Sequence, residues 1–319
     1  MHVTSKAVAV GDIEIACTVV GEGIPLVVLH GAAGLGSTYM RALHPWADEF
    51  QLVYYDQRGS GRTPLGDMHD DWFTSGVEDL DRLRVALGFD AVNIVVHSTA
   101  AHLGALYAGL RPQTTSTLVL LNSGPPLAPE LMQRFGQAMA GRRTPADDAE
   151  RQAIEESQEF RGKQPAALER HQLNTFIPFF RDRAIIEQVS LGFTDITAAN
   201  VQAAPARVMG SLSALNPMQT YAEIRCPTLV VHSELDPAAD PTERACRIGP
   251  TRTPWHGDSL STTVAGLARS VVAGTRGDTL LSAGPTVAPG LSAGGARRPV
   301  IGCNRTNAKA AQYGPRGTR

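Results

Sequence analysis

The sequence is organised around short, largely apolar runs that alternate with longer segments of helical periodicity. The apolar runs lie at residues 25–29, 51–55, 91–96, 117–121 and 228–232. Each run is too short for a typical helix and lacks alternating polar residues, so each predicts a strand that is buried on both faces. Helical patterns at 39–48, 76–87 and 99–110 separate the first four runs, and Ser75 and Glu78 have the spacing of a capping box at the second pattern. This alternation predicts an α/β fold, with a mostly parallel central sheet and helices on both faces.

Two regions depart from the alternation. Residues 3–10 and 13–20 flank Gly11 and Asp12, a pattern that predicts a β-hairpin with a two-residue turn. Residues 123–222 contain charged helical segments, such as 147–160 and 181–191, without a strong strand pattern. We therefore expect a core formed by 1–122 and 223–260, a helical cap insertion at 123–222, and an atypical tail at 261–319.

Charge is distributed unevenly along the chain. Residues 245–319 carry ten Lys and Arg against two acidic residues, whereas residues 1–244 carry 19 basic and 29 acidic residues. The last 75 residues also contain 12 Gly and show neither helical nor strand periodicity. A reading-frame shift near residue 244 would produce this change, and so would a divergent or disordered extension. Both explanations stay open.

Composition excludes several classes of protein. No stretch approaches the ~18 apolar residues of a membrane-spanning helix, and the start lacks the features of a secretory signal. The four cysteines lie far apart, which argues against a disulfide framework or a zinc site. The sequence has no basic stripe with interleaved aromatic residues, so it gives no indication of nucleic-acid binding. We expect a cytoplasmic protein without a membrane or nucleic-acid partner, and its oligomeric state is not readable.

A candidate nucleophile follows the third buried strand. The strand at 91–96 leads into His97-Ser98-Thr99 and then into a helical pattern. A sharp turn between a strand and a helix exposes a serine hydroxyl for nucleophilic attack. The usual pattern is G-x-S-x-G, and here Val96 and Ala100 stand at the glycine positions. On spacing alone, Ser98 also fits an ordinary helix N-cap.

Two other strand ends carry glycine-rich loops. In His30-Gly31-Ala32, small residues allow a close approach to substrate, so the Ala32 and Thr99 amides are candidates for an oxyanion hole. A simple turn into a helix is the alternative. The segment from Asp56 to Thr63 predicts a tight turn in which Asp56 and Arg58 form an ion pair or loop hydrogen bonds, a structural rather than a catalytic role.

These segments, in this order and spacing, resemble the α/β-hydrolase fold superfamily. The run Asp56-Gln57-Arg58-Gly59-Ser60-Gly61-Arg62-Thr63 is similar to a segment of the proline iminopeptidases, and His97-Ser98-Thr99 resembles the elbow of haloperoxidase-like serine hydrolases. The resemblance implies a triad in the chain order Ser, acid, His. The resemblance assigns the acid of the triad to Asp236, after the strand at 228–232. The alternative is that Asp236 is a solvated acid in a loop.

The triad histidine is the least regular feature. After Asp236 the chain contains only His256, and nineteen residues separate the two. The fold normally inserts a helix of roughly 11 residues, a strand of roughly 5 and their connections there. His256 is therefore a provisional general base.

The resulting prediction is a serine hydrolase that needs no cofactor and no metal. Ser98 would attack an ester or amide of a small molecule or short peptide, in a proline iminopeptidase-like or esterase reaction, with Asp236 and His256 completing the triad. An aminopeptidase would need acids for the substrate's ammonium group, and Glu155, Glu156 and Glu159 are candidates unless they form a solvated helix face. The alternative is a catalytically impaired binding protein that lacks a complete triad.

Overall fold

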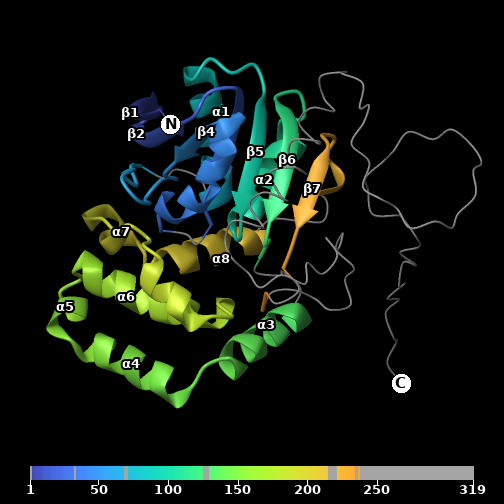
Figure 1. Ribbon diagram of the computed structural model, residues 1–319. Coiled ribbons are helices and arrows are strands. Elements are labelled where there is room, and N and C mark those ends of the chain that lie inside the picture. Colours follow the sequence, from blue (N-terminus) through green and yellow to red (C-terminus); the bar gives the residue numbers. More distant parts are fainter. Residues whose placement is uncertain are drawn as a thin grey trace, which may run out of the picture.

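In the computed structural model, the described residues are 2–31, 34–67, 71–124, 129–214, 221–233 and 236–237. Within them, seven strands form one sheet in the order β1-β2-β4-β3-β5-β6-β7 (Figure 1). The first three strands in this order pair antiparallel, and the others pair parallel. The strands are β1 (Val3–Val10), β2 (Ile13–Val20), β3 (Ile24–Leu29), β4 (Phe50–Tyr55), β5 (Val92–His97), β6 (Thr115–Leu121) and β7 (Thr228–Val231). The predicted α/β fold, its hairpin and its buried strands are confirmed.

The central strands are buried on both faces. In β3, Val27 and Leu29 belong to one apolar cluster, whereas Leu26 and Val28 belong to another on the opposite face. Helices α1 (Trp72–Ala86) and α2 (Ala100–Leu110) contribute to the first cluster, and the segment η1 (Thr38–Asp48) contributes Met40 and Trp46 to the second. Burial on both faces explains why these strands have no alternating polar residues.

Two helix predictions were wrong in detail. The segment expected as a helix at 39–48 is the 3-10 helix η1, which contains Pro45. Proline has no N–H to donate and disrupts an α-helix at an interior position. Helix α1 begins at Trp72 rather than near Gly76, because the Asp71 carboxylate caps it by accepting from the amides of Phe73 and Thr74.

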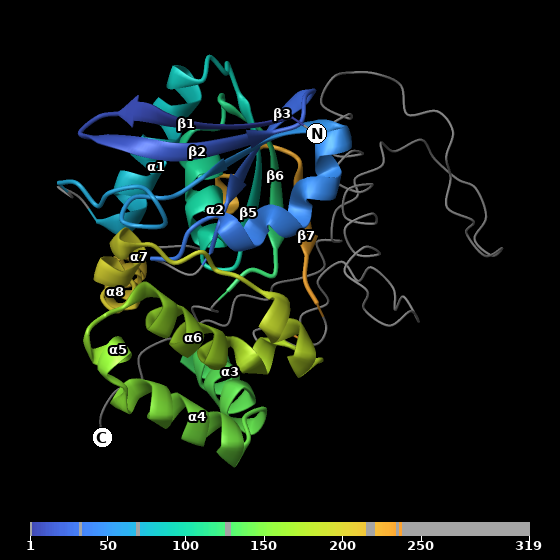
Figure 2. The same cartoon turned by 60° about the vertical axis from the view of Figure 1, so that its left-hand side comes forward.

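A layer of helices lies at the carboxyl edge of the sheet, as Figures 1 and 2 show from two directions. Its elements are α3 (Pro129–Gly141), α4 (Pro145–Glu156), α5 (Gln158–Arg161), α6 (Pro165–Phe176), η2 (Ile177–Phe179), η3 (Arg183–Gln188), α7 (Asp195–Asn200) and α8 (Ala204–Ala214). Helix α8 contributes Val208 and Leu212 to the core cluster shared with α1. The layer is thus anchored to the core by its last helix. None of the helices in the described ranges is long and apolar enough to cross a membrane.

A buried ion-pair cluster fixes the loop after β4. The Arg58 guanidinium donates to both oxygens of Asp79 at 2.8 and 2.9 Å and to both oxygens of Asp12 at 2.9 and 3.0 Å. The side chains of Arg58 and Asp79 are only 7% and 4% exposed. The hydrogen bond from Arg58 holds the pKa of Asp12 well below its usual range. The cluster joins the β1–β2 turn, the loop and α1.

Of the two alternatives predicted for Asp56 and Arg58, the loop hydrogen bonds are confirmed and the ion pair between them is not, because the two side chains have separate partners. Asp56 is buried and accepts from the amide and hydroxyl of Ser37 at 2.8 and 2.7 Å. It also accepts from the amide and Nε of Arg62, each at 3.0 Å. Asp56 therefore ties η1 to the loop after β4, which agrees with the structural role predicted for it.

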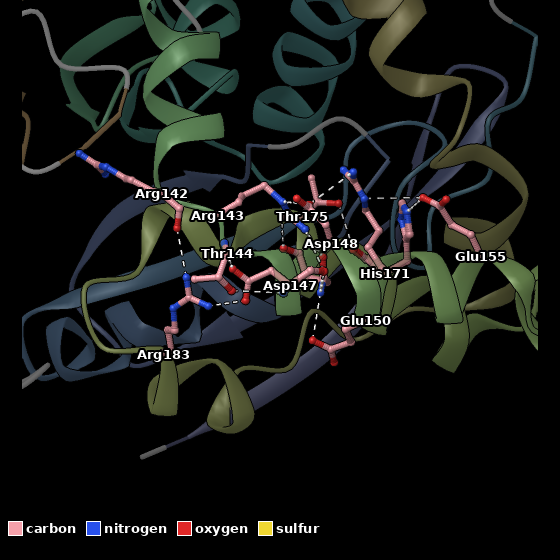
Figure 3. Close-up of polar contacts among 12 residues, drawn as sticks. Arg142, Arg143, Thr144, Asp147, Asp148, Glu150, Glu155, His171, Thr175 and Arg183 are labelled. Atoms are coloured by element: carbon pink, nitrogen blue, oxygen red, sulfur yellow. Dashed lines mark hydrogen bonds and ion pairs between the residues drawn. The ribbon is translucent and has the colours of Figure 1, made fainter.

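The polar network of the helical layer centres on Asp147 in α4 (Figure 3). Asp147 forms a capping box with Thr144, and Arg183 donates to its carboxylate. The Arg183 hydrogen bond lowers the pKa of Asp147 to about 2. Arg143 extends the network by donating to Asn174 and Asp148. These contacts connect α4 to α6 and η3.

We predict that Arg58→Gln lowers the free energy of unfolding by about 3–5 kcal/mol, because it leaves the buried carboxylate of Asp79 without its cation. The matched control is Arg225→Gln, since Arg225 pairs with Glu223 on the surface, where both side chains are about 60% exposed. Loss of that surface pair should change stability by less than about 1 kcal/mol. Urea unfolding of the three proteins measures both effects, and equal losses would contradict a stabilising role for the Arg58 cluster.

We predict a pH-dependent stability contribution from Asp147. A carboxyl whose pKa is lower in the folded state stabilises the fold above its unfolded pKa of about 3.9, and the contribution is lost as the pH falls towards the folded value. Asp147→Asn should therefore be less stable than the wild type at pH 6, and the difference should shrink between about pH 4 and pH 2. Thermal unfolding of the wild type and Asp147→Asn across this range measures the difference in stability, with Asp148→Asn as the neighbouring exposed control. A difference that does not change with pH would contradict this role of Asp147.

Candidate active site

Ser98 lies at the turn between β5 and α2, with a backbone φ of +54°. This left-handed conformation is uncommon for a residue with a side chain and costs of order 1–2 kcal/mol. Three backbone bonds hold it: the Ser98 amide donates to Leu121, and the Ser98 carbonyl accepts from Ala101 and Gly124. Strain of this kind is typical of a nucleophile on a sharp strand-to-helix turn.

The N-cap interpretation of Ser98 does not fit this geometry. An N-cap residue usually has extended backbone and a side-chain oxygen that accepts from the first helical turn. The residue at the N-cap of α2 is Thr99, and its side chain makes no capping hydrogen bond. Ser98 precedes the cap and is only partly buried.

Val96 takes the position that glycine usually has two residues before the serine, and a second glycine compensates for it. A Cβ atom on Gly104, in the middle of α2, would lie 2.6 Å from Cγ1 of Val96 and 3.3 Å from Cδ1 of Leu118. Gly104 therefore provides the room that the valine side chain occupies between β5 and α2. The departure from G-x-S-x-G is accommodated within the core, which no local motif of the sequence revealed.

The loop after β3 lies directly against the serine. A Cβ atom on Gly31 would be 2.5 Å from the His97 carbonyl oxygen and 2.7 Å from Cβ of Ser98. Only glycine permits this approach. The amide of Thr99 stands at the start of α2, next to Ser98. Ala32, the other predicted oxyanion donor, lies outside the described residues.

Tyr39 connects the loop and the turn, and sequence reasoning missed it. The Gly31 amide donates to the Tyr39 hydroxyl at 2.6 Å, and this hydroxyl lies 3.0 Å from Nδ1 of His97. Enclosure of the His97 ring lowers its pKa to about 4, although the charge of Asp236 acts in the opposite direction. His97 is therefore neutral at pH 7, and Asp236 is near enough to act on it.

Asp236 follows β7 at the same edge of the sheet, and its side chain is 9% exposed. Its amide donates to the Ser233 carbonyl at 3.1 Å, and one carboxylate oxygen lies 3.9 Å from Nε2 of His232. Asn122, at the end of β6, accepts from the Ser233 amide at 2.8 Å through its side chain. The loop that carries the predicted acid is thus attached to the neighbouring strand.

Three histidines of the described ranges bond to groups other than Ser98 and Asp236. Buried His30 accepts from the Gln57 amide and pairs with the Gly31 carbonyl, and desolvation lowers its pKa. His102 pairs with the Tyr221 hydroxyl at 2.5 Å, and His171 pairs with Glu155 at 2.9 Å. His256, the predicted base, lies outside the described residues.

The three acids considered for ammonium binding are exposed. Glu155 contacts His171 and Arg151, and Glu156 accepts from Gln152 within α4. Glu159 is in the short helix α5. Figures 1 and 2 both show α4 as the part of the helical layer farthest from the sheet, so the fold does not bring these acids to Ser98.

A small pocket lies beside the serine. The loop after β3 contributes Gly31, the start of α2 contributes Thr99 and Ala100, and α8 contributes Val208. The helical layer therefore forms part of the wall next to the predicted oxyanion donors. Among the described residues, no group of three or more His, Cys, Asp or Glu side chains has the arrangement of a metal site.

A mostly parallel sheet in this strand order, with a left-handed serine between a strand and a helix at its carboxyl edge, defines an α/β hydrolase. A family model described as alpha/beta hydrolase fold matches residues 24–246, and the chain belongs to this family.

Similar proteins include several proline iminopeptidases. One from Xylella fastidiosa (strain 9a5c) is 38% identical over 101 residues, and this match covers 31% of the chain and 32% of the relative. The chain thus spans about a third of the length of that relative. One from Heyndrickxia coagulans is 27% identical over 234 residues, 70% of the chain and 78% of the relative. The crystal structure of a Mycobacterium smegmatis proline iminopeptidase superposes with a TM-score of 0.59 at 21% identity, covering 85% of this chain and 99% of that one, and supports the fold.

We predict that Gly104→Ala destabilises the protein by about 1–2 kcal/mol, although alanine favours a helix over glycine by about 1 kcal/mol. The new methyl group would clash with Val96, whose branched side chain has little freedom to move. In a Val96→Ala background the same substitution should become neutral or stabilising. Thermal unfolding of the single and double variants measures this coupling, and additive effects would show that the two positions are independent.

Proposed function

We propose that this protein is a serine hydrolase that cleaves a small ester or amide through an acyl-enzyme on Ser98. The observation that carries the proposal is the left-handed φ of Ser98 at the end of β5. A fold has no structural need for a strained serine there, since a glycine or asparagine would adopt this backbone at lower cost. The contact between Gly31 and Ser98 also supports it, because it brings the predicted oxyanion loop next to the nucleophile.

In the proposed mechanism, the Ser98 oxygen attacks the acyl carbon while its proton passes to His256. The amides of Ala32 and Thr99 donate to the oxygen that becomes negative. His256 then gives the proton to the leaving alcohol or amine, and Asp236 orients the histidine and stabilises its charged form. A water molecule, deprotonated by the same histidine, releases the acid product and restores Ser98.

The substrate class has two candidates. The similarity to proline iminopeptidases favours peptides with an N-terminal proline as substrates of this protein. Such a substrate carries an ammonium group, and the three acids considered for it, Glu155, Glu156 and Glu159, are exposed on α4 and α5. Uncharged short-chain esters need no such acid, and both classes belong in the test.

We predict that wild-type protein reacts covalently with a fluorophosphonate probe and that Ser98→Ala abolishes labelling. The matched control is Ser123→Ala. Ser123 follows β6 at the same edge of the sheet, and its buried hydroxyl has no hydrogen-bond partner within the described ranges. Its variant should label like the wild type. Labelling is measured by intact-protein mass spectrometry, and loss of turnover of at least 10³-fold in Ser98→Ala is expected with whichever substrate is accepted.

The contrary result is equally specific. A wild-type protein that binds proline amides or short-chain esters but shows neither labelling nor turnover would be the catalytically impaired binding protein. Equal labelling of wild type and Ser98→Ala would place the nucleophile elsewhere. Comparison of the rates for proline amides and esters then separates peptidase from esterase activity.

A further inference from the structure

We infer that Tyr39 is a positioning residue for the proposed hydrolysis, with its hydroxyl holding the oxyanion loop at a fixed distance from Ser98. The inference rests on the proposed function and adds a residue to it. Tyr39 is the second residue of η1, far in sequence from the serine, and it reaches the site only through the packing of η1 beside β3.

The direction of the first hydrogen bond follows from the chemistry of its groups. The Gly31 amide has only a proton to offer, so it donates to the Tyr39 oxygen at 2.6 Å. The Tyr39 hydroxyl also contacts Nδ1 of His97 at 3.0 Å. In the neutral tautomer of His97 with its proton on Nε2, Nδ1 accepts the phenol proton; in the other tautomer, Nδ1 donates to the phenol oxygen. The chain of bonds therefore runs from the loop, through Tyr39, to the residue next to Ser98.

This chain opposes movement of the loop in one direction, and Gly31 opposes it in the other. The loop cannot move closer to Ser98, because Gly31, which has no side chain, already lies at contact distance from it. It cannot move away without breaking the bond from the Gly31 amide to Tyr39. A defined gap between loop and nucleophile is what an oxyanion hole requires, since its donors act only at about 2.7–3.1 Å from the developing charge.

The bond also removes one amide from the possible oxyanion donors. The Gly31 N–H is occupied by Tyr39, so it is not the donor that would bind the oxyanion. This agrees with the donor proposed from the sequence, which is the amide of Ala32 and not that of Gly31.

The environment of Tyr39 gives the ring a fixed position. Its ring contacts the edge of His97 with centroids 5.5 Å apart and an interplanar angle of 64°. Tyr39 also packs against the apolar cluster that contains Leu35, Leu191 and Val201. Burial raises the pKa of Tyr39 well above its ordinary value, so the hydroxyl keeps its proton.

The test compares two tyrosines with similar surroundings. Tyr39→Phe removes the bridging hydroxyl and keeps the ring. The matched control is Tyr54→Phe. Tyr54 contacts the edge of His44 with centroids also 5.5 Å apart, and its buried hydroxyl has no hydrogen-bond partner among the residues that the structure describes. Both variants thus lose one buried oxygen beside a histidine. Only Tyr39→Phe also loses a link between the loop after β3 and the turn that carries Ser98.

We predict that Tyr39→Phe lowers kcat about 10-fold with KM within 2-fold of wild type, because the loop acts mainly on the transition state. The rate of fluorophosphonate labelling should fall by a similar factor. Tyr54→Phe should keep kcat, KM and labelling rate within 2-fold. A second variant, His97→Phe, removes the histidine partner of the same chain and should lower kcat about 3-fold. Steady-state kinetics on the preferred ester or amide, with Tm values for each variant, provide the measurement.

Each other outcome overturns the inference in a distinguishable way. If Tyr39→Phe matches Tyr54→Phe while the wild type is active, Tyr39 has no positioning role. If Tyr39→Phe changes kcat and KM together and lowers Tm sharply, its role is structural only. If the wild type itself shows no Ser98-dependent labelling or turnover, the proposed function fails and the role of Tyr39 fails with it.

Discussion

The conformation of one residue, Ser98, constrains the rest of the site. A serine with a φ of +54° is stable only where its surroundings leave no alternative, and here those surroundings come from the ends of β6 and β3 and the start of α2. The Leu121 carbonyl at the end of β6 receives its amide, and Gly124 and Ala101 donate to its carbonyl. Gly31, after β3, fills the remaining side. The strain of order 1–2 kcal/mol is thus offset by the sheet itself, and the serine inherits the rigidity of the sheet.

The same sheet explains why so much of the fold could be predicted. Runs such as Leu26–Leu29 are apolar at every position because both faces are covered, and this burial leaves a signal within a few residues of sequence. Signals that depend on distant partners were not available. Arg58 pairs with Asp79 and Asp12, which are distant in sequence, whereas the sequence offered only Asp56, two residues away, as an ion-pair partner for it, with loop hydrogen bonds as the alternative.

The residues of the candidate site show the same contrast between local signals, which the sequence carries, and contacts with distant residues, which it does not. Ser98 was identified from a strand followed by a helical pattern, and its backbone now supports that choice. Gly104 and Tyr39 were missed, because each acts on a residue that is near in space only after folding. Gly104 looks like an ordinary glycine in a helix, and Tyr39 looks like one aromatic residue in a polar segment. Ala32 and His256 stay predictions, since both lie outside the described residues.

The spacing of the strands limits how the proposed triad can be completed. Ser98 follows β5 and Asp236 follows β7, with β6 between them, so their backbones are separated by about two strand spacings, or roughly 10 Å. A serine hydroxyl and a carboxylate cannot bond directly over this distance, but an imidazole with a hydrogen bond at each nitrogen can connect them. The ring must then lie over the end of β6, near Asn122. Among the described histidines, His232 follows β7 and lies 3.9 Å from Asp236, and His97, the last residue of β5, already contacts the Tyr39 hydroxyl through Nδ1. If His256 is the base, as proposed, its ring has to take this position above the end of β6.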